Sequence, residues 1–249
     1  MYMTLKKYLL IFLAAGILFG FGHATQRDRF VFTQLKYNGD WDPYPFVYRD
    51  VLSFITVATS IRVVPERRVL TLDSRMLYSS PFLVMMNKGE FGGFSEKQRD
   101  SLRRYLDNGG TLFIEDNSGN ITSPFDMRIR QELEELYPGE RLRKLRKDNV
   151  LYRTFYLIRH VTGRKLINNY IEGMDVGGRT AILYSRNDMF GVWVRDNFGN
   201  FFLKCVPGGE EQRFEAQKLT ANLIVYSVTG TYKSDTIHQP FIRKKLGID

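Results

Sequence analysis

Polar and charged side chains follow four separate apolar runs of this sequence, and their types could do chemistry together. They are Trp41 and Asp42, then Lys88, then Glu115, Asp116 and Asn117, and finally Asn187 and Asp188. The set offers a flat apolar face, a cation, carboxylates and amides, a combination that suits a small polar ligand. We therefore predict one ligand-binding crevice formed by these residues.

The stretch from Gly109 to Gly119 indicates how such residues are positioned. A glycine turn leads into the apolar run Thr111 to Ile114, which ends abruptly in acidic and small polar residues. A run that is apolar on both faces needs covering layers on both sides, as in a parallel sheet. Parallel strands place all their carboxyl ends at one edge, so the four polar tips should meet there.

The rest of the chain alternates helix and strand patterns, which predicts an α/β fold with a mostly parallel sheet. Ser95 and Gln98 form a capping box at the start of one predicted helix. Aromatic and aliphatic residues recur without a clear period in 150–178, and we interpret this region as an insert or an extended crossover. The further predicted strands are 29–37, 68–72, 81–86 and 179–185, with a hairpin of 191–195 and 200–206; the predicted helices are 47–60, 95–108, 125–137 and 210–229.

A nucleophilic mechanism has weak support, and we assign no catalytic residue. Ser118 follows the central strand but lacks the glycine frame of a nucleophile elbow. Its base would have to be His160 or the distant His238. An ordinary turn serine and a structural histidine are the simpler interpretation.

Metal and nucleotide sites are also weakly indicated, and we assign no metal ligand or cofactor. Cys205 lies in an apolar run and is expected to be buried. Together with two scattered histidines it does not make a zinc site. The acids at the strand ends could bind Ca²⁺ or Mg²⁺, or they could cap helices and close turns. The loop from Gly89 to Gly93 lacks the phosphate-binding fingerprints.

The first 24 residues have the order typical of a signal peptide: Lys6 and Lys7, an apolar run, then Gly22-His23-Ala24. An uncleaved anchor is the alternative, although the run is shorter than the roughly 20 residues of a spanning helix. We predict a signal peptide at 1–24, one α/β domain at 25–229 and a tail at 230–249. The expected location is the periplasm or the exterior.

The chain is basic, with a net charge of +9. Removing residues 1–24, which carry two lysines and no acid, lowers this charge to +7. A basic run could dock on an anionic membrane or cell-wall polymer, or form a solvated face. Its members are Arg141, Arg143, Lys144, Arg146 and Lys147. Export disfavours nucleic acid as a partner.

Several short motifs, in order, resemble a bacterial family of domains of unknown function, the one numbered four thousand one hundred and fifty-nine. They are 37–43, 105–110, Glu115-Asp116, Phe125-Asp126, 137–139, 184–188 and 222–226. The resemblance covers roughly 30–229 and implies a three-layer flavodoxin-like fold, similar to class I glutamine amidotransferases. Where relatives often carry histidines, this chain has Asn87-Lys88-Gly89 and Asp148-Asn149.

Two classes of function follow. The first is a non-catalytic module of the cell envelope that binds a small polar ligand or an envelope protein. The second is a divergent hydrolase or amidotransferase-like enzyme that uses carboxylates. The missing cysteine nucleophile and base favour the first class.

Cleavage of the signal peptide predicts a mature chain that begins near Thr25, because small residues precede that position. Amino-terminal sequencing of protein recovered from its native host checks this. An intact Met1 would instead indicate a retained anchor.

Overall fold

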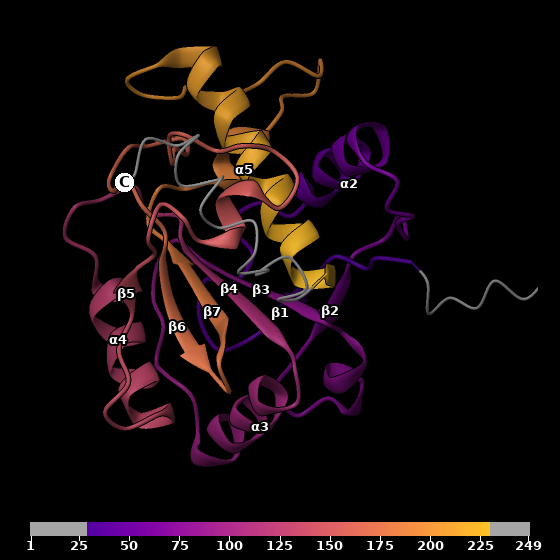
Figure 1. Cartoon of the computed structure of the whole chain (residues 1–249). Helices are drawn as coiled ribbons and strands as arrows, with labels where there is room; N and C mark the ends of the chain where they lie inside the picture. The colour runs from indigo at the N-terminus through magenta and orange to yellow at the C-terminus, as the bar shows by residue number, and fades with distance from the viewer. Residues whose placement is uncertain (1–28, 230–249) are drawn as a thin grey trace, which may run out of the picture.

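The computed structural model describes residues 29–229, which form a sheet between two layers of helices (Figure 1). The predicted signal peptide and tail lie outside the described residues. The sheet has seven strands in the order β2-β1-β3-β4-β7-β6-β5. Their bounds are β1 Thr33–Leu35, β2 Arg68–Leu70, β3 Phe82–Asn87, β4 Thr111–Asp116, β5 Arg143–Lys144, β6 Glu172–Val176 and β7 Arg179–Ser185.

The predicted mostly parallel sheet is confirmed. Strands β2, β1, β3, β4 and β7 are mutually parallel, and their order is that of flavodoxin-like doubly wound sheets. The predicted first strand was too long, because regular pairing covers only Thr33–Leu35, while Phe30 forms an isolated bridge to Val63.

Two regions differ from the sequence prediction. Within 150–178 the structure has β6, which pairs antiparallel with β7 and extends the sheet. Residues Phe190–Trp193 form a 3-10 helix instead of the predicted strand. The amide N–H groups of Met189 and Phe190 both donate to Glu115. Successive residues of a strand alternate in direction, so two adjacent amides pointing at one carboxylate require a tight turn.

Helices cover both faces of the sheet (Figure 1). One face carries α2 (Val47–Ala58), α5 (Gly209–Thr229) and the 3-10 helices Val150–Arg153 and Phe190–Trp193. The other carries α3 (Glu96–Asp107) and α4 (Pro124–Leu136), and a further 3-10 helix spans Arg75–Ser79. Strand β4 serves both cores, because Phe113 belongs to the first and Leu112 and Ile114 to the second.

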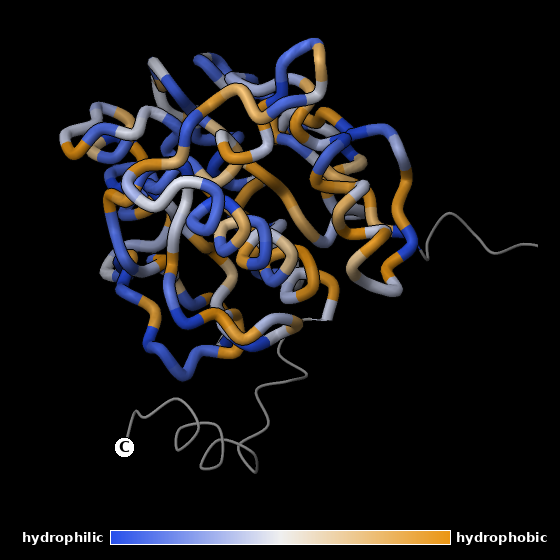
Figure 2. Tube along the Cα trace, turned by 90° about the horizontal axis from the view of Figure 1, so that it is seen from above, coloured by the Kyte–Doolittle hydropathy of each residue, from blue (hydrophilic) through white to orange (hydrophobic). Residues whose placement is uncertain are grey.

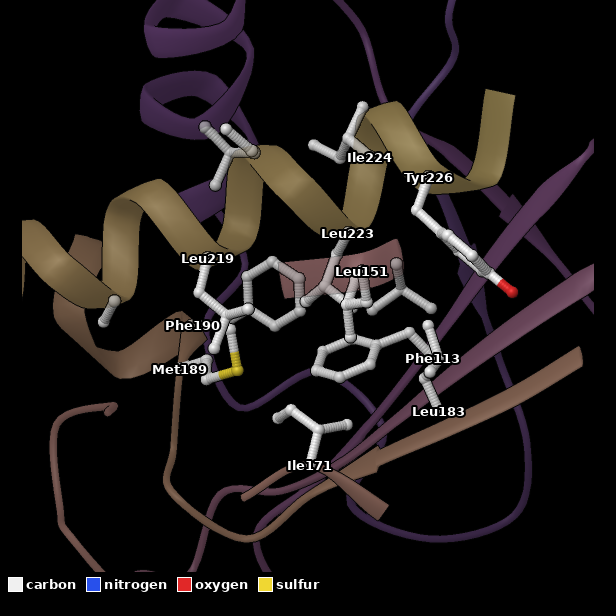
Figure 3. Packing of buried hydrophobic residues seen from close by; sticks show 14 of the residues in the cluster. Phe113, Leu151, Ile171, Leu183, Met189, Phe190, Leu219, Leu223, Ile224 and Tyr226 are labelled. Carbon is white, nitrogen blue, oxygen red and sulfur yellow. The ribbon is translucent and has the colours of Figure 1, made fainter. Parts of the chain in front are cut away.

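The α5 core is built around Phe190, which lies between the helix and the sheet (Figure 3). Its ring meets Phe32 and Phe113 edge-on, with centroids 5.7 and 5.9 Å apart. Leu219 and Leu223 of α5 point toward the same core (Figure 3). Helix α5 therefore holds the 3-10 turn after β7 against the sheet.

Apolar and polar stretches alternate along the backbone trace, and many outer loops are hydrophilic (Figure 2).

Helix caps follow the sequence signals. The predicted capping box of α3 is confirmed, because Ser95 Oγ accepts from the Gln98 amide at 3.3 Å and Gln98 Oε1 accepts from the Ser95 amide at 3.0 Å. Ser123 caps α4, and Pro124 occupies its first turn. Within 29–229 no helix is long and apolar enough to cross a membrane.

Candidate functional site

Glu115, at the carboxyl end of β4, is completely buried. Its Oε2 accepts hydrogen bonds from the Phe190 amide at 2.9 Å and from Asn117 Nδ2 at 2.8 Å. Its Oε1 accepts from the Met189 amide. A single carboxylate thus fixes the start of the 3-10 turn that carries Phe190 into the core.

Asp188, after β7, lies beside it and is equally buried. Asn117 Nδ2 donates to Asp188 Oδ1 at 2.9 Å, and the Tyr44 hydroxyl donates to Oδ2 at 3.1 Å. Arg164 Nε forms an ion pair with Oδ2. Tyr44, Glu115, Asn117, Arg164 and Asp188 together are called the carboxylate cluster below. It joins segments that are up to 144 positions apart in the sequence.

The backbone around Asp188 is shaped for this cluster. Asp188 adopts a φ of 55°, a left-handed conformation that few non-glycine residues adopt. The Gly191 amide donates to Asp188 Oδ1 at 3.2 Å. A Cβ at Gly191 would lie 2.5 Å from the Asp188 carboxylate, so only glycine fits there. The ion pair and hydrogen bonds of Asp188 hold this conformation in place.

The electrostatics of the cluster follow from its burial. Desolvation raises the pKa of Glu115 well above its ordinary value, and the neighbouring Asp188 charge adds to the rise, while its three N–H donors oppose it. Burial also raises the pKa of Asp188, although the Arg164 guanidinium opposes that shift. Two carboxylates face one guanidinium, so full ionisation would leave one buried negative charge unbalanced.

The other predicted members of the crevice occupy different positions. Asn187 is buried and fastens the segment from Gly163 to Asn168. Its Oδ1 accepts from the Ile167 and Asn168 amides at 3.0 and 2.8 Å, and its Nδ2 donates to Asn168 O at 2.7 Å. All of its side-chain polar atoms are engaged within the fold.

Trp41 and Asp42 belong to a second cluster around Arg67. The Arg67 guanidinium donates to both Asp42 oxygens at 2.6 and 2.7 Å and to Gln34 Oε1 at 2.6 Å. It also lies 5.8 Å from the Trp41 ring centroid. Asp42 is therefore already neutralised by a bidentate partner.

Lys88 and Asp116 lie at the ends of β3 and β4. Lys88 is exposed, and its Nζ is 5.5 Å from the centroid of the Tyr44 ring. Asp116 is buried; its Oδ1 accepts from the Ser118 amide at 2.9 Å, but its Oδ2 has no hydrogen-bond partner among residues 29–229. Asn87, the register partner of Asp116 on β3, likewise has an unpartnered buried Oδ1.

A cavity of about 530 Å³, called the strand-end cavity below, opens beside these residues. Phe91 and Phe125 contribute apolar surface, with ring centroids 5.6 Å apart. The lining consists of 87–92, Ser118, Asn120 and 123–125. Of the predicted crevice residues only Lys88 belongs to it, while Glu115, Asn117 and Asp188 meet in the carboxylate cluster.

The predicted basic run is exposed and partly paired. Arg146 donates to both oxygens of Asp148 at 3.1 and 2.9 Å, and Lys144 Nζ lies 4.8 Å from the Tyr170 ring. Arg141 and Lys147 form no ion pair with any residue in 29–229. The run therefore keeps spare positive charge beside the edge strand β5.

The described residues contain no assembled nucleophile or metal site. Ser118 Oγ accepts a hydrogen bond from the Asn120 amide at 3.2 Å, and no hydrogen bond connects it to His160, which is exposed. Within 29–229 no group of three or more histidine, cysteine or acidic side chains is placed to hold a metal ion. Cys205 is buried, as expected, and burial raises the pKa of its thiol.

Sequence reasoning missed Tyr44 and Arg164, the partners of Asp188. Arg164 lies in the region without clear periodicity. The one local sequence feature that points to a contact there is the preceding residue, Gly163. A Cβ there would lie 2.1 Å from the carbonyl oxygen of Asn187. The glycine thus marks a close approach of two chain segments, but sequence alone does not name the second.

The bridging amide of Asn117 gives a first prediction. Asn117→Ala removes the hydrogen bonds to both buried carboxylates, so we expect a loss of about 2–4 kcal/mol in the free energy of unfolding. Asn120→Ala is the matched control, because the Asn120 side chain is exposed. Urea denaturation of both variants checks this, and equal stabilities would contradict the bracing role of Asn117.

The raised pKa of Glu115 gives a second prediction. A raised pKa means that the folded chain retains a proton that the unfolded chain loses near pH 4.3. The contribution of Glu115 is complete below that pH and is lost as the pH rises through the raised pKa. The stability of wild type relative to Glu115→Gln should therefore fall as the pH rises above about 4.3. A relative stability that increases with pH would mean that the N–H donors keep Glu115 ionised.

Comparison with known proteins agrees with the resemblance seen in the sequence. A search of curated proteins found no match. The model of the family described as Domain of unknown function (DUF4159) matches residues 31–228, which include the whole described sheet. The chain therefore belongs to the DUF4159 family.

Proposed function

We propose that this protein is an exported, non-catalytic module of the cell envelope that binds a small polar ligand in the strand-end cavity. The observation that carries this proposal is Asn87, which lines the cavity and whose buried Oδ1 has no hydrogen-bond partner within 29–229. Asp116, its register partner on β4, likewise has an unpartnered buried Oδ2 within 29–229. Buried acceptors without donors are costly, and such groups occur where a ligand or water completes the bonding.

The cavity supports a ligand of modest size with hydrogen-bond donors. Its volume of about 530 Å³ is in the usual range of small-molecule sites. Phe91 and Phe125 offer apolar contact, whereas Lys88 and Glu90 bring one charge of each sign. Hydroxyl or ammonium groups would meet the free acceptors. A monosaccharide or a free amino acid has this combination of size and chemistry.

The alternative is a divergent hydrolase or amidotransferase-like enzyme that uses carboxylates. Its acids would be Glu115 and Asp188, whose raised pKa values are a feature of many active sites. Both side chains, however, have no exposed surface, and all four of their oxygens accept hydrogen bonds from the fold. A substrate would have to displace these bonds, so the binding role has the better support.

Export and envelope attachment rest on the sequence of residues 1–24 and on the basic surface. Arg141 and Lys147, exposed and without ion pairs within 29–229, supply positive charge that an anionic lipid or wall polymer would attract. This basic run is at β5, away from the strand-end cavity formed by the tips of β3 and β4. Docking and ligand binding could therefore occur together.

Filling the cavity tests the binding role. Gly92 lines it, lacks a positive φ, and has open space where a Cβ would stand. Gly92→Trp should therefore occupy the cavity without disturbing the fold, and Gly92→Ala is the matched control. Saturation-transfer NMR against a panel of monosaccharides and amino acids should give at least one signal that Gly92→Ala keeps and Gly92→Trp loses.

Two results would contradict the proposal. In the first, Gly92→Trp keeps every binding signal of the panel although it is folded. A melting temperature within about 2 °C of that of Gly92→Ala, which corresponds to less than 1 kcal/mol, shows that it is folded. The other is hydrolysis of a panel of amide and ester substrates by the wild type that is lost in Ser118→Ala or Glu115→Gln.

A further inference from the structure

A second and larger cavity, of about 660 Å³, lies at the opposite edge of the sheet. It is bordered by the residues that precede β1, β2 and β3 and by the ends of α2 and α5. We call it the amino-edge cavity. Because strand-end ligands of parallel sheets occupy the carboxyl edge, the proposed function leaves this cavity unexplained.

Three arginines line the amino-edge cavity: Arg29, Arg62 and Arg68. No acidic residue is in its lining, and no carboxylate among residues 29–229 pairs with any of the three. The neighbouring Arg67, by contrast, has a bidentate carboxylate partner in Asp42. The three unpaired arginines therefore concentrate positive charge in one hollow.

Hydroxyl groups accompany the arginines. Arg68 Nη1 donates to Ser80 Oγ at 3.3 Å, and Ser80 Oγ lies 3.2 Å from Thr33 Oγ1. Ser80 and Thr33 are buried, so they fix the Arg68 guanidinium at the cavity wall. Ser60 and Ser79, both exposed, also line the cavity. The Ser79 hydroxyl donates to the Met76 carbonyl at 2.7 Å, so Ser60 is the one that adds a hydrogen-bond donor.

The helix ends nearby do not cancel this charge. Helix α2 ends at Ala58 and α5 at Thr229, and each carboxyl terminus carries roughly half a negative charge. Together they amount to about one negative charge against three guanidinium groups. An arginine could cap such a helix end, but none of these three donates a hydrogen bond to a carbonyl of α2 or α5. The cavity keeps a net positive charge.

We propose that the amino-edge cavity binds a phosphate group. Guanidinium forks match phosphate oxygens in geometry and charge, and serine hydroxyls can donate to the remaining oxygens. The phosphate could belong to a soluble small molecule or to a phospholipid headgroup, since both present negatively charged phosphate oxygens. This site is independent of the strand-end cavity and of the ligand proposed there.

The test uses the purified chain and inorganic phosphate, titrated by calorimetry at constant ionic strength. Arg29→Gln/Arg62→Gln removes two positive charges whose side chains form no hydrogen bond or ion pair within 29–229, so the fold should be unaffected. We expect phosphate affinity to fall about tenfold or more. The matched control is Arg104→Gln/Arg159→Gln, which removes two exposed arginines elsewhere and should keep wild-type affinity.

A second arm distinguishes the sources of phosphate. Sedimentation with phosphatidylcholine vesicles, with and without phosphatidylglycerol, measures headgroup binding. Binding to the anionic vesicles that Arg29→Gln/Arg62→Gln weakens and the control keeps identifies a headgroup, whereas binding through the basic run at β5 would be equal in both pairs. Phosphate binding without vesicle binding identifies a soluble ligand. The proposal is overturned if neither probe binds, or if the cavity pair loses no more binding than the control pair, including the case in which both pairs bind as the wild type does.

Discussion

The fold at the carboxyl edge depends on one side-chain amide. Asn117 donates one hydrogen bond to Glu115 and another to Asp188, and so joins the tips of β4 and β7. Glu115 in turn holds the amides of Met189 and Phe190, which directs the Phe190 ring under α5. Without this bridge both carboxyl groups would lose a shared donor in a medium of low polarity, and the neighbouring Asp188 charge would disfavour ionisation of Glu115 further. The interior of the α5 layer therefore relies on polar contacts made at the sheet edge.

This arrangement decides which residues remain for function. Acids at strand ends normally suggest catalysis or metal binding, but here Glu115 and Asp188 are fully engaged inside the protein and Asp42 is paired with Arg67. Within 29–229 the groups that retain unused hydrogen-bonding capacity are different ones: Asn87 Oδ1 in the lining of the strand-end cavity, Asp116 Oδ2 on the neighbouring strand, and the guanidinium groups of the amino-edge cavity. Polar groups without a partner indicate where a ligand would gain binding energy better than acids that already have partners do.

Sequence patterns predicted the sheet well because its central strands are apolar on both faces and because serine caps mark the starts of α3 and α4. The Ser95 capping box and the run from Thr111 to Ile114 are local signals, and both appear as expected. The carboxyl-edge placement of the polar tips also follows from parallel topology. Contacts between side chains do not, since the partners of Asp188 come from a loop at Tyr44 and from Arg164, in a stretch without periodicity. The partly polar strand β6 was missed because its pairing with β7 defines it better than its own sequence does.

The two cavities differ in charge, and this follows from where carboxylates and arginines find partners. On the carboxyl edge, Arg164 and Arg67 form ion pairs with Asp188 and Asp42. Among residues 29–229 the adjoining cavity is therefore lined by the buried acceptor of Asn87 and by one cation, Lys88. At the amino edge no acidic residue of 29–229 lines the cavity, and Arg29, Arg62 and Arg68 form no ion pair within that range. A ligand that donates hydrogen bonds is therefore favoured at one edge and an anion at the other. Because the sheet separates them, a molecule bound at one edge cannot compete directly for the other, and each proposal can be tested without disturbing the second.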